Sequence, residues 1–238
     1  MQAATSFSQR ALMWALGGML ALGIAGCGAE PKERAAFIAF LQARIVDKPG
    51  LHVPILTRQE EKSFGDYAKH FAVITDYNKS MDAKVQQPLR DMMSKNMLIT
   101  MSELVARRAD VVALHKTSAQ LRALIDTEQA AAGSRRVALK QPDDLKPVFD
   151  KAYARAVTDP GNNFKEFLVV MEGMLTSAEK MADFLDTHKD QVKFSGVMAQ
   201  IDDPKVLDEA NVRMKELNAK SAEVARADRK LLSMISGH

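Results

Sequence analysis

Cys27 is the residue whose surroundings point most clearly to a specific reaction. It ends a segment with the spacing of the bacterial lipobox, whose other members are Leu22, Ile24, Ala25 and Gly26. At such a site the thiol is alkylated with diacylglycerol and a peptidase cuts before the cysteine. The new amino terminus then receives a further fatty chain such as palmitate. We therefore predict that Cys27 is lipidated.

The first 26 residues have the layout of a lipoprotein signal peptide. A polar segment ends at Arg10, and an apolar stretch of about fifteen residues follows, which is shorter than the roughly twenty needed to cross a bilayer as a helix. The alternative is an ordinary secretory signal or a membrane anchor in which Cys27 is incidental. We expect residues 1–26 to be removed and Cys27 to become the first residue of the mature chain.

Residues 27–34 are expected to form the lipidated amino terminus and a short tether. Two or three acyl chains make membrane attachment stable, whereas one does not. From Cys27 to Lys32 the chain spans at most about 18 Å, so we expect the folded domain to lie against the membrane. Gly28 after the cysteine favours the periplasmic face of the outer membrane.

Composition argues against several classes of function. The chain has 33 Lys and Arg against 30 Asp and Glu, which is too small a basic excess for a nucleic-acid partner. Cys27 is the only cysteine, so once it is acylated the mature protein has neither a disulfide nor a free thiol for catalysis or metal binding.

We find no arrangement of residues typical of an active site or of a metal or cofactor site, and we therefore predict that the protein is not an enzyme. The histidines lack the spacing of a helical zinc site, and the acids near 143–159 lack that of a calcium loop. Asp228 lies on an otherwise apolar stripe. Either the stripe has left the core at that turn, or Asp228 pairs with a basic group of the helix that contains Arg107 and Arg108.

Helical periodicity dominates residues 35–238, which predicts a single all-α domain: a bundle of four or five long helices with short connecting helices. Ser102 to about Ala132 contains neither Gly nor Pro, so one long helix ending at Gly133 is expected. The last helix should begin at Asp203-Pro204, with an apolar stripe from Leu207 to Ile235.

Prolines and glycines predict the breaks between helices. Thr57 and Glu60 have the spacing of a capping box at a helix start. Pro88 is expected to kink or end its helix, and residues 159–162 to separate a short helix from the next long one. Near 191–201 the pattern does not fit a helix, and a small β-hairpin or an ordered loop is expected instead.

Two segments carry a resemblance to a known family. AFIAFLQ at 36–42 and ALKQPDDLKPVFD at 138–150 resemble YiaF-type lipoproteins of Gram-negative bacteria, which share domain of unknown function 3053. The position of the cysteine, the total length and the order of segments also agree. The resemblance implies a lipoprotein and brings no catalytic residues to this sequence.

The second of these segments has two interpretations, a rigid capped entry into a helix or a docking loop for a partner. The candidate docking residues are Lys140, Pro142, Asp143, Asp144, Lys146 and Pro147.

Two hypotheses for function follow. In the first, a bundle anchored in the envelope membrane acts through contacts with another envelope protein and exposes an apolar patch of roughly several hundred Å². In the alternative, a lipid or small apolar ligand binds between helices lined by Met and Phe, which requires an internal cavity of at least a few hundred Å³.

Overall fold

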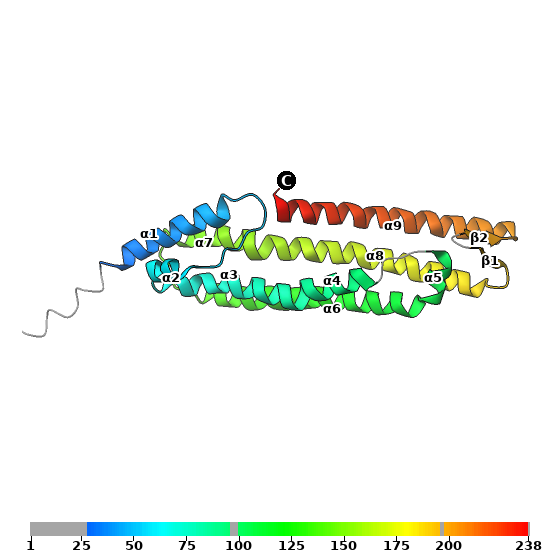
Figure 1. Ribbon diagram of the computed structural model, residues 1–238, viewed down its shortest axis with the longest axis horizontal. Coiled ribbons are helices and arrows are strands. Elements are labelled where there is room, and N and C mark those ends of the chain that lie inside the picture. Colours follow the sequence, from blue (N-terminus) through cyan, green and yellow to red (C-terminus); the bar gives the residue numbers. More distant parts are fainter. Residues whose placement is uncertain (1–27, 96–99, 196–197, 238) are drawn as a thin grey trace, which may run out of the picture.

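Four long helical segments run side by side along the molecule, which is an elongated rod (Figure 1). The structure is a computed structural model and describes residues 28–95, 100–195 and 198–237. The long segments, including the π-helical turns η2 and η3, are α3 (Tyr67–Met81), η2 (Asp82–Gln86) and α4 (Gln87–Lys95); α6 (Arg108–Val137); α7 (Lys146–Tyr153), η3 (Ala154–Thr158) and α8 (Asp159–Thr187); and α9 (Pro204–Ser236). This architecture confirms the predicted all-α bundle. In the described ranges, no helix is both long and apolar enough to cross a bilayer.

Helix α8 lies at the centre of the rod. It packs against α6 on one side and α9 on the other (Figure 1). Its buried face repeats every three or four residues, as an amphipathic helix requires. The large buried residues of this face are Phe164, Phe167, Leu168, Met171, Leu175, Met181 and Leu185.

One end of the rod, which we call the near end, is built around aromatic side chains. Helices α1 (Glu30–Leu41) and α2 (Arg58–Phe64) pack there against α3, and the π turn η1 (Gln42–Val46) continues α1. Phe37, Phe40, Phe64 and Phe71 are all buried, with ring centroids 5.0–5.4 Å apart in three pairs. The predicted capping box of Thr57 and Glu60 begins α2.

The opposite, far end carries the predicted hairpin. Strands β1 (Val192–Ser195) and β2 (Met198–Ile201) pair antiparallel, with Val192 opposite Ile201. Val192 is buried, whereas Phe194 is 40 % exposed. Asp203 then caps α9 by accepting hydrogen bonds from the next amides, as predicted.

The predicted break at 159–162 is wrong, because the helix continues through Pro160. The π turn η3 lies immediately before it and widens the helix where the proline ring would otherwise meet a carbonyl group. Gly161 lets α8 approach α3 and α6 closely, since a Cβ there would lie 2.6 Å from the Tyr77 hydroxyl. Pro88 follows η2 in the same way and does not end its helix.

The long helix expected from Ser102 to Ala132 is in fact two helices. Helix α5 (Met101–Ala106) ends at Arg107, whose φ of −109° and ψ of 22° are not helical. This turn lets Leu104 pack into the core beside α8. Nor does α6 stop at Gly133: it runs on to Val137, and Arg136 in its last turn lies over the ring of Tyr153.

The predicted stripe of α9 is confirmed inside the helix, where Ala210 and Leu231 are buried, but not at its two ends. Leu207 and Ile235 are about 40 % exposed, and Val206 is buried in place of Leu207. Asp228 is half-buried, and its proposed pairing with the Arg107-Arg108 helix is wrong, because α9 packs on α8 and β2. The stripe therefore covers a single neighbouring helix.

Candidate functional site: the near end of the rod and an apolar groove

The described chain begins one residue after the predicted lipidation site. Cys27 and the lipobox residues lie outside the described residues. The described chain starts at Gly28, two residues before α1, and α1 occupies the near end (Figure 1). Glu30 in its first turn accepts a hydrogen bond from the Tyr67 hydroxyl. Burial and this contact with Glu30 raise the pKa of Tyr67 to about 12.

The candidate docking loop also lies at the near end, where it enters α7. Leu145 is fully buried and anchors the loop, whereas Asp143 and Asp144 are exposed. The Arg34 guanidinium of α1 lies 3.2 Å from the Asp144 carboxylate. Lys140, Lys146 and Pro147 are exposed and Pro142 is half-buried, and the Lys146 ammonium lies 2.7 Å from Asp150. The loop that leads into α7 therefore also contacts α1 through this ion pair.

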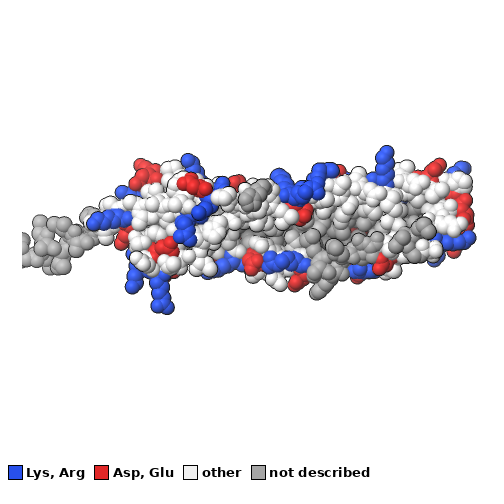
Figure 2. Space-filling model, turned by 45° about the horizontal axis from the view of Figure 1, so that its top comes forward, with Lys and Arg blue, Asp and Glu red and all other residues white. Residues whose placement is uncertain are grey.

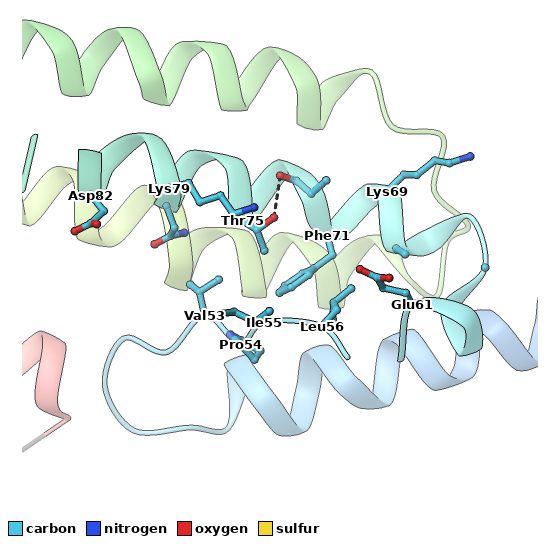
Figure 3. A pocket seen from close by; sticks show the side chains of 14 residues that line it. Val53, Pro54, Ile55, Leu56, Glu61, Lys69, Phe71, Thr75, Lys79 and Asp82 are labelled. Atoms are coloured by element: carbon cyan, nitrogen blue, oxygen red, sulfur yellow. Dashed lines mark hydrogen bonds between the residues drawn. The ribbon is translucent and has the colours of Figure 1, made fainter. Parts of the chain in front are cut away.

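A groove of about 680 Å³ lies between α3 and the extended segment 51–57 (Figure 3). Val53 and Leu56 of the segment point toward α3, and the Phe71 ring points back toward them (Figure 3). Small side chains of α3, Ala68, Ala72 and Thr75, make its floor. The groove is open at the surface, where Ile55 is 90 % exposed.

Charged side chains stand only at the rim of the groove. Glu61, Lys69, Lys79 and Asp82 lie around it, two acids and two bases. Lys69 and Asp66 are 2.6 Å apart, and each holds the pKa of the other toward its charged form. Over the face shown in Figure 2, acidic and basic side chains are likewise mixed. The lining thus suits an apolar ligand.

The groove differs from the predicted ligand site. It is an open groove instead of an internal cavity, and of the predicted Met and Phe lining only Phe71 is among its wall residues. Segment 51–57 was not predicted to form a wall of a site. The available signal was the run Val53-Pro54-Ile55-Leu56, four consecutive apolar residues just before the predicted helix start at Thr57.

Three histidines of the described residues, His70, His115 and His188, make separate contacts. His115 contacts Glu179 at 2.9 Å across α6 and α8. His188 contacts its own helix at the Phe184 carbonyl, and His70 lies 3.4 Å from the Gln141 amide. Among the described residues, no three His, Cys, Asp or Glu side chains are grouped closely enough to hold a metal ion.

The buried hydroxyl of Tyr77 has no hydrogen-bond partner in the described part of the chain. Burial raises the pKa of this phenol. The carbonyl groups of η3 next to it are satisfied by side-chain amides, from Asn78 at 3.1 Å to Ala156 and from Gln129 at 3.2 Å to Thr158. This polar cluster explains how the π turn is accommodated in the core.

An elongated helical bundle with a small hairpin and an apolar groove beside its amino-terminal end is the class that fold and site define. The family described as "Protein of unknown function (DUF3053)" matches residues 15–232, and the chain belongs to this family. It is 26% identical to "Uncharacterized protein YiaF" of Escherichia coli (strain K12) over 178 residues, 74% of this chain and 75% of that protein. The proteins of the same name from Escherichia coli O157:H7 and Shigella flexneri match equally well. No solved structure matches the chain.

Proposed function

We propose that this protein is an envelope lipoprotein, anchored by acyl chains on Cys27 and facing the periplasm from the outer membrane. In this proposal the bundle acts by contacting an envelope protein and not by catalysis. The observation that carries it is the place where the described chain starts, at the end of a long rod (Figure 1). An anchor at Cys27 would keep the near end of the rod at the membrane surface. The short tether would not restrict the position of the far end.

The rod is long enough to place a second contact far from its anchor. Residues 146–187 form one continuous helical segment, which at 1.5 Å per residue is about 60 Å long. The exposed large apolar residues are distributed over several elements, and α9 carries Leu207, Val212, Leu232 and Ile235. We propose that a partner binds along α9, whose main contacts within the bundle are with α8 and β2.

Replacing Cys27 by Ser in the full-length precursor tests the anchor. We expect unprocessed precursor, no acyl mass on the amino-terminal peptide and loss of the mature membrane-bound form. A Cys27→Ser variant that is cut and membrane-bound like the wild type would contradict the proposal. The control is Lys32→Ser, which changes an exposed residue of the same region and should be processed normally.

The groove supports a second candidate function, the binding of an apolar ligand. Its volume of about 680 Å³ is in the range of small-molecule sites, and its walls are apolar. Native mass spectrometry tests this on two unacylated proteins, one with the wild-type groove and one with Ala72→Trp, which fills the groove. A small added mass on the first protein that is absent from the second would support ligand binding. Identical masses for both proteins would count against it.

A further inference from the structure

The near end of the groove is fixed to the first turns of α1. The Glu33 carboxylate packs so closely against Gly65 that a Cβ on Gly65 would overlap it, and Gly65 belongs to the wall of the groove. Glu30, one turn earlier, holds the Tyr67 hydroxyl. The start of the described chain and the mouth of the groove are therefore neighbours.

The distance from Cys27 to this mouth is short. Ala29 lies one helical turn before Glu33, about 6 Å along the axis. Cys27 precedes Ala29 by two residues, which span at most about 7 Å. The backbone of Cys27 is therefore within about 13 Å of that of Glu33, and the Glu33 side chain reaches Gly65.

The groove has the dimensions of one acyl chain. It follows α3 and the first residue of η2 from Ala68 to Asp82, about 21 Å at 1.5 Å per residue. One leaflet of a bilayer, the depth that one acyl chain fills, is about 15 Å of hydrocarbon. A volume of about 680 Å³ accommodates a single ligand of small-molecule size. It has no room for the three chains of a mature lipoprotein.

The lining also has the chemistry that such a chain requires. An acyl chain has no hydrogen-bonding groups, so it needs apolar walls and leaves no polar partner unsatisfied. Ala68, Ala72 and Thr75 provide a low floor along α3, and Val53 and Leu56 form the opposite wall (Figure 3). Ionic rim residues remain at the edges, where they keep their contact with water.

We propose that in the lipidated protein one acyl chain attached to Cys27 folds back along α3 and occupies the groove, while the other chains insert into the membrane. This rests on the proposed lipidation of Cys27. Two inserted chains are enough for stable attachment, so the third is available for the groove. The bound chain ties the near end of the rod to its own anchor and covers the apolar surface around Ile55.

A single thiol in the groove tests the proposal, because acylation consumes the thiol of Cys27 and the chain has no other cysteine. Thr75→Cys places the thiol on the groove floor. Thr127→Cys is the matched control on the exposed part of α6: Thr127 donates to Ala123 at 3.0 Å as Thr75 donates to Ala72 at 3.4 Å. Each is made in the full lipidated chain and in the unacylated mature chain with Cys27→Ser. All four proteins are mixed with vesicles of phosphatidylethanolamine and phosphatidylglycerol.

The rate of alkylation by a water-soluble maleimide is then measured. We expect lipidation to slow the reaction of Thr75→Cys about tenfold, which corresponds to a groove filled about nine-tenths of the time, and to leave Thr127→Cys within about twofold. Equal rates for the lipidated and unacylated Thr75→Cys proteins would overturn the proposal. Protection in the unacylated protein would overturn it too, since a membrane lipid would then be the occupant.

The mass of the amino-terminal peptide separates this proposal from the proposed function. Acyl mass on Cys27 with equal alkylation rates refutes the groove alone, whereas absence of acyl mass refutes both. If Thr75→Cys does not fold, as judged by circular dichroism, Ala68→Cys reports on the same groove floor with the same expected protection.

Discussion

The two ends of the rod are built differently. The near end packs Phe37, Phe40, Phe64 and Phe71 into one buried cluster. At the far end, the hairpin buries Val192 and is joined by surface contacts such as the Lys193–Asp202 pair at 3.0 Å. Apolar burial stabilises far more than an exposed ion pair. We therefore expect the aromatic cluster of the near end to contribute more to stability than the hairpin of the far end.

The largest expected effect comes from the aromatic cluster. Phe37→Ala should lower the free energy of unfolding by about 3–5 kcal/mol, because Phe37 is fully buried and contacts the rings of Phe64 and Tyr67. At the far end, Val192→Ala removes two buried methylene equivalents and should cost about 1.5 kcal/mol. Denaturant unfolding of both variants checks this. Equal losses would remove the distinction between the ends.

The contact of the α9 carboxyl end with the loop before segment 51–57 should have the next largest effect. Gly50 has a φ of 70°, and a Cβ there would overlap the Ile235 carbonyl group. Gly50→Ala should cost about 1–3 kcal/mol and speed hydrogen exchange in the last turns of α9. The matched control is Gly173→Ala within α8, where a Cβ is 3.9 Å from its nearest neighbour and the helix should gain about 1 kcal/mol. Unchanged exchange in Gly50→Ala would show that the contact does not hold α9.

Ion pairs should contribute little to the stability of either end. Asp144→Ala removes the contact with Arg34 at the near end, and Lys193→Ala removes that with Asp202 at the far end. All four side chains are partly or largely exposed, so each variant should lose less than about 1 kcal/mol. Thermal unfolding measures both. A loss at the near end as large as that of Phe37→Ala would mean that charge, and not packing, stabilises it.

The smallest expected effect is a pH dependence at the near end. Burial lowers the pKa of His70 in the folded state, so below about pH 6.5 the unfolded chain takes up a proton that the folded protein does not. The free energy of unfolding should therefore fall as the pH drops from 7 to 5. His70→Gln should lose part of this dependence, as measured by denaturant unfolding at both pH values. His115→Gln, which changes a histidine between α6 and α8, is the control. If the stability of His70→Gln depended on pH as strongly as that of the wild type, His70 would not be the source of the pH dependence.

Periodicity predicted the long helices because their apolar faces are buried, as in α8, and side-chain spacing reports on burial. It failed where the tertiary structure compensates a helix breaker. Pro160 and Gly161 together read as a stop, yet η3 relieves the proline and the bundle needs the glycine for a close approach. The end at Arg107 was missed because no helix-breaking residue marks it.

The candidate site was predictable only in part. The lipobox is a local pattern, so Cys27 could be singled out from sequence alone. The groove depends on segment 51–57 lying beside α3, a contact that no spacing encodes. The apolar run of the segment was visible in the sequence, but Ala68, Ala72 and Thr75 on the groove floor became part of a site only in three dimensions.

The most direct test of the anchoring account is the height of the two ends above a membrane. Lys32→Cys and Lys189→Cys place exposed labelling sites near the start of α1 and just after α8. Energy transfer from a fluorophore at each site to an acceptor lipid is measured for the lipidated protein on vesicles. We expect the label at 32 to lie next to the bilayer and the label at 189 to be farther away by up to about 60 Å. Equal transfer from both labels would show that the rod lies flat or is anchored elsewhere, and would contradict a rod held by its near end.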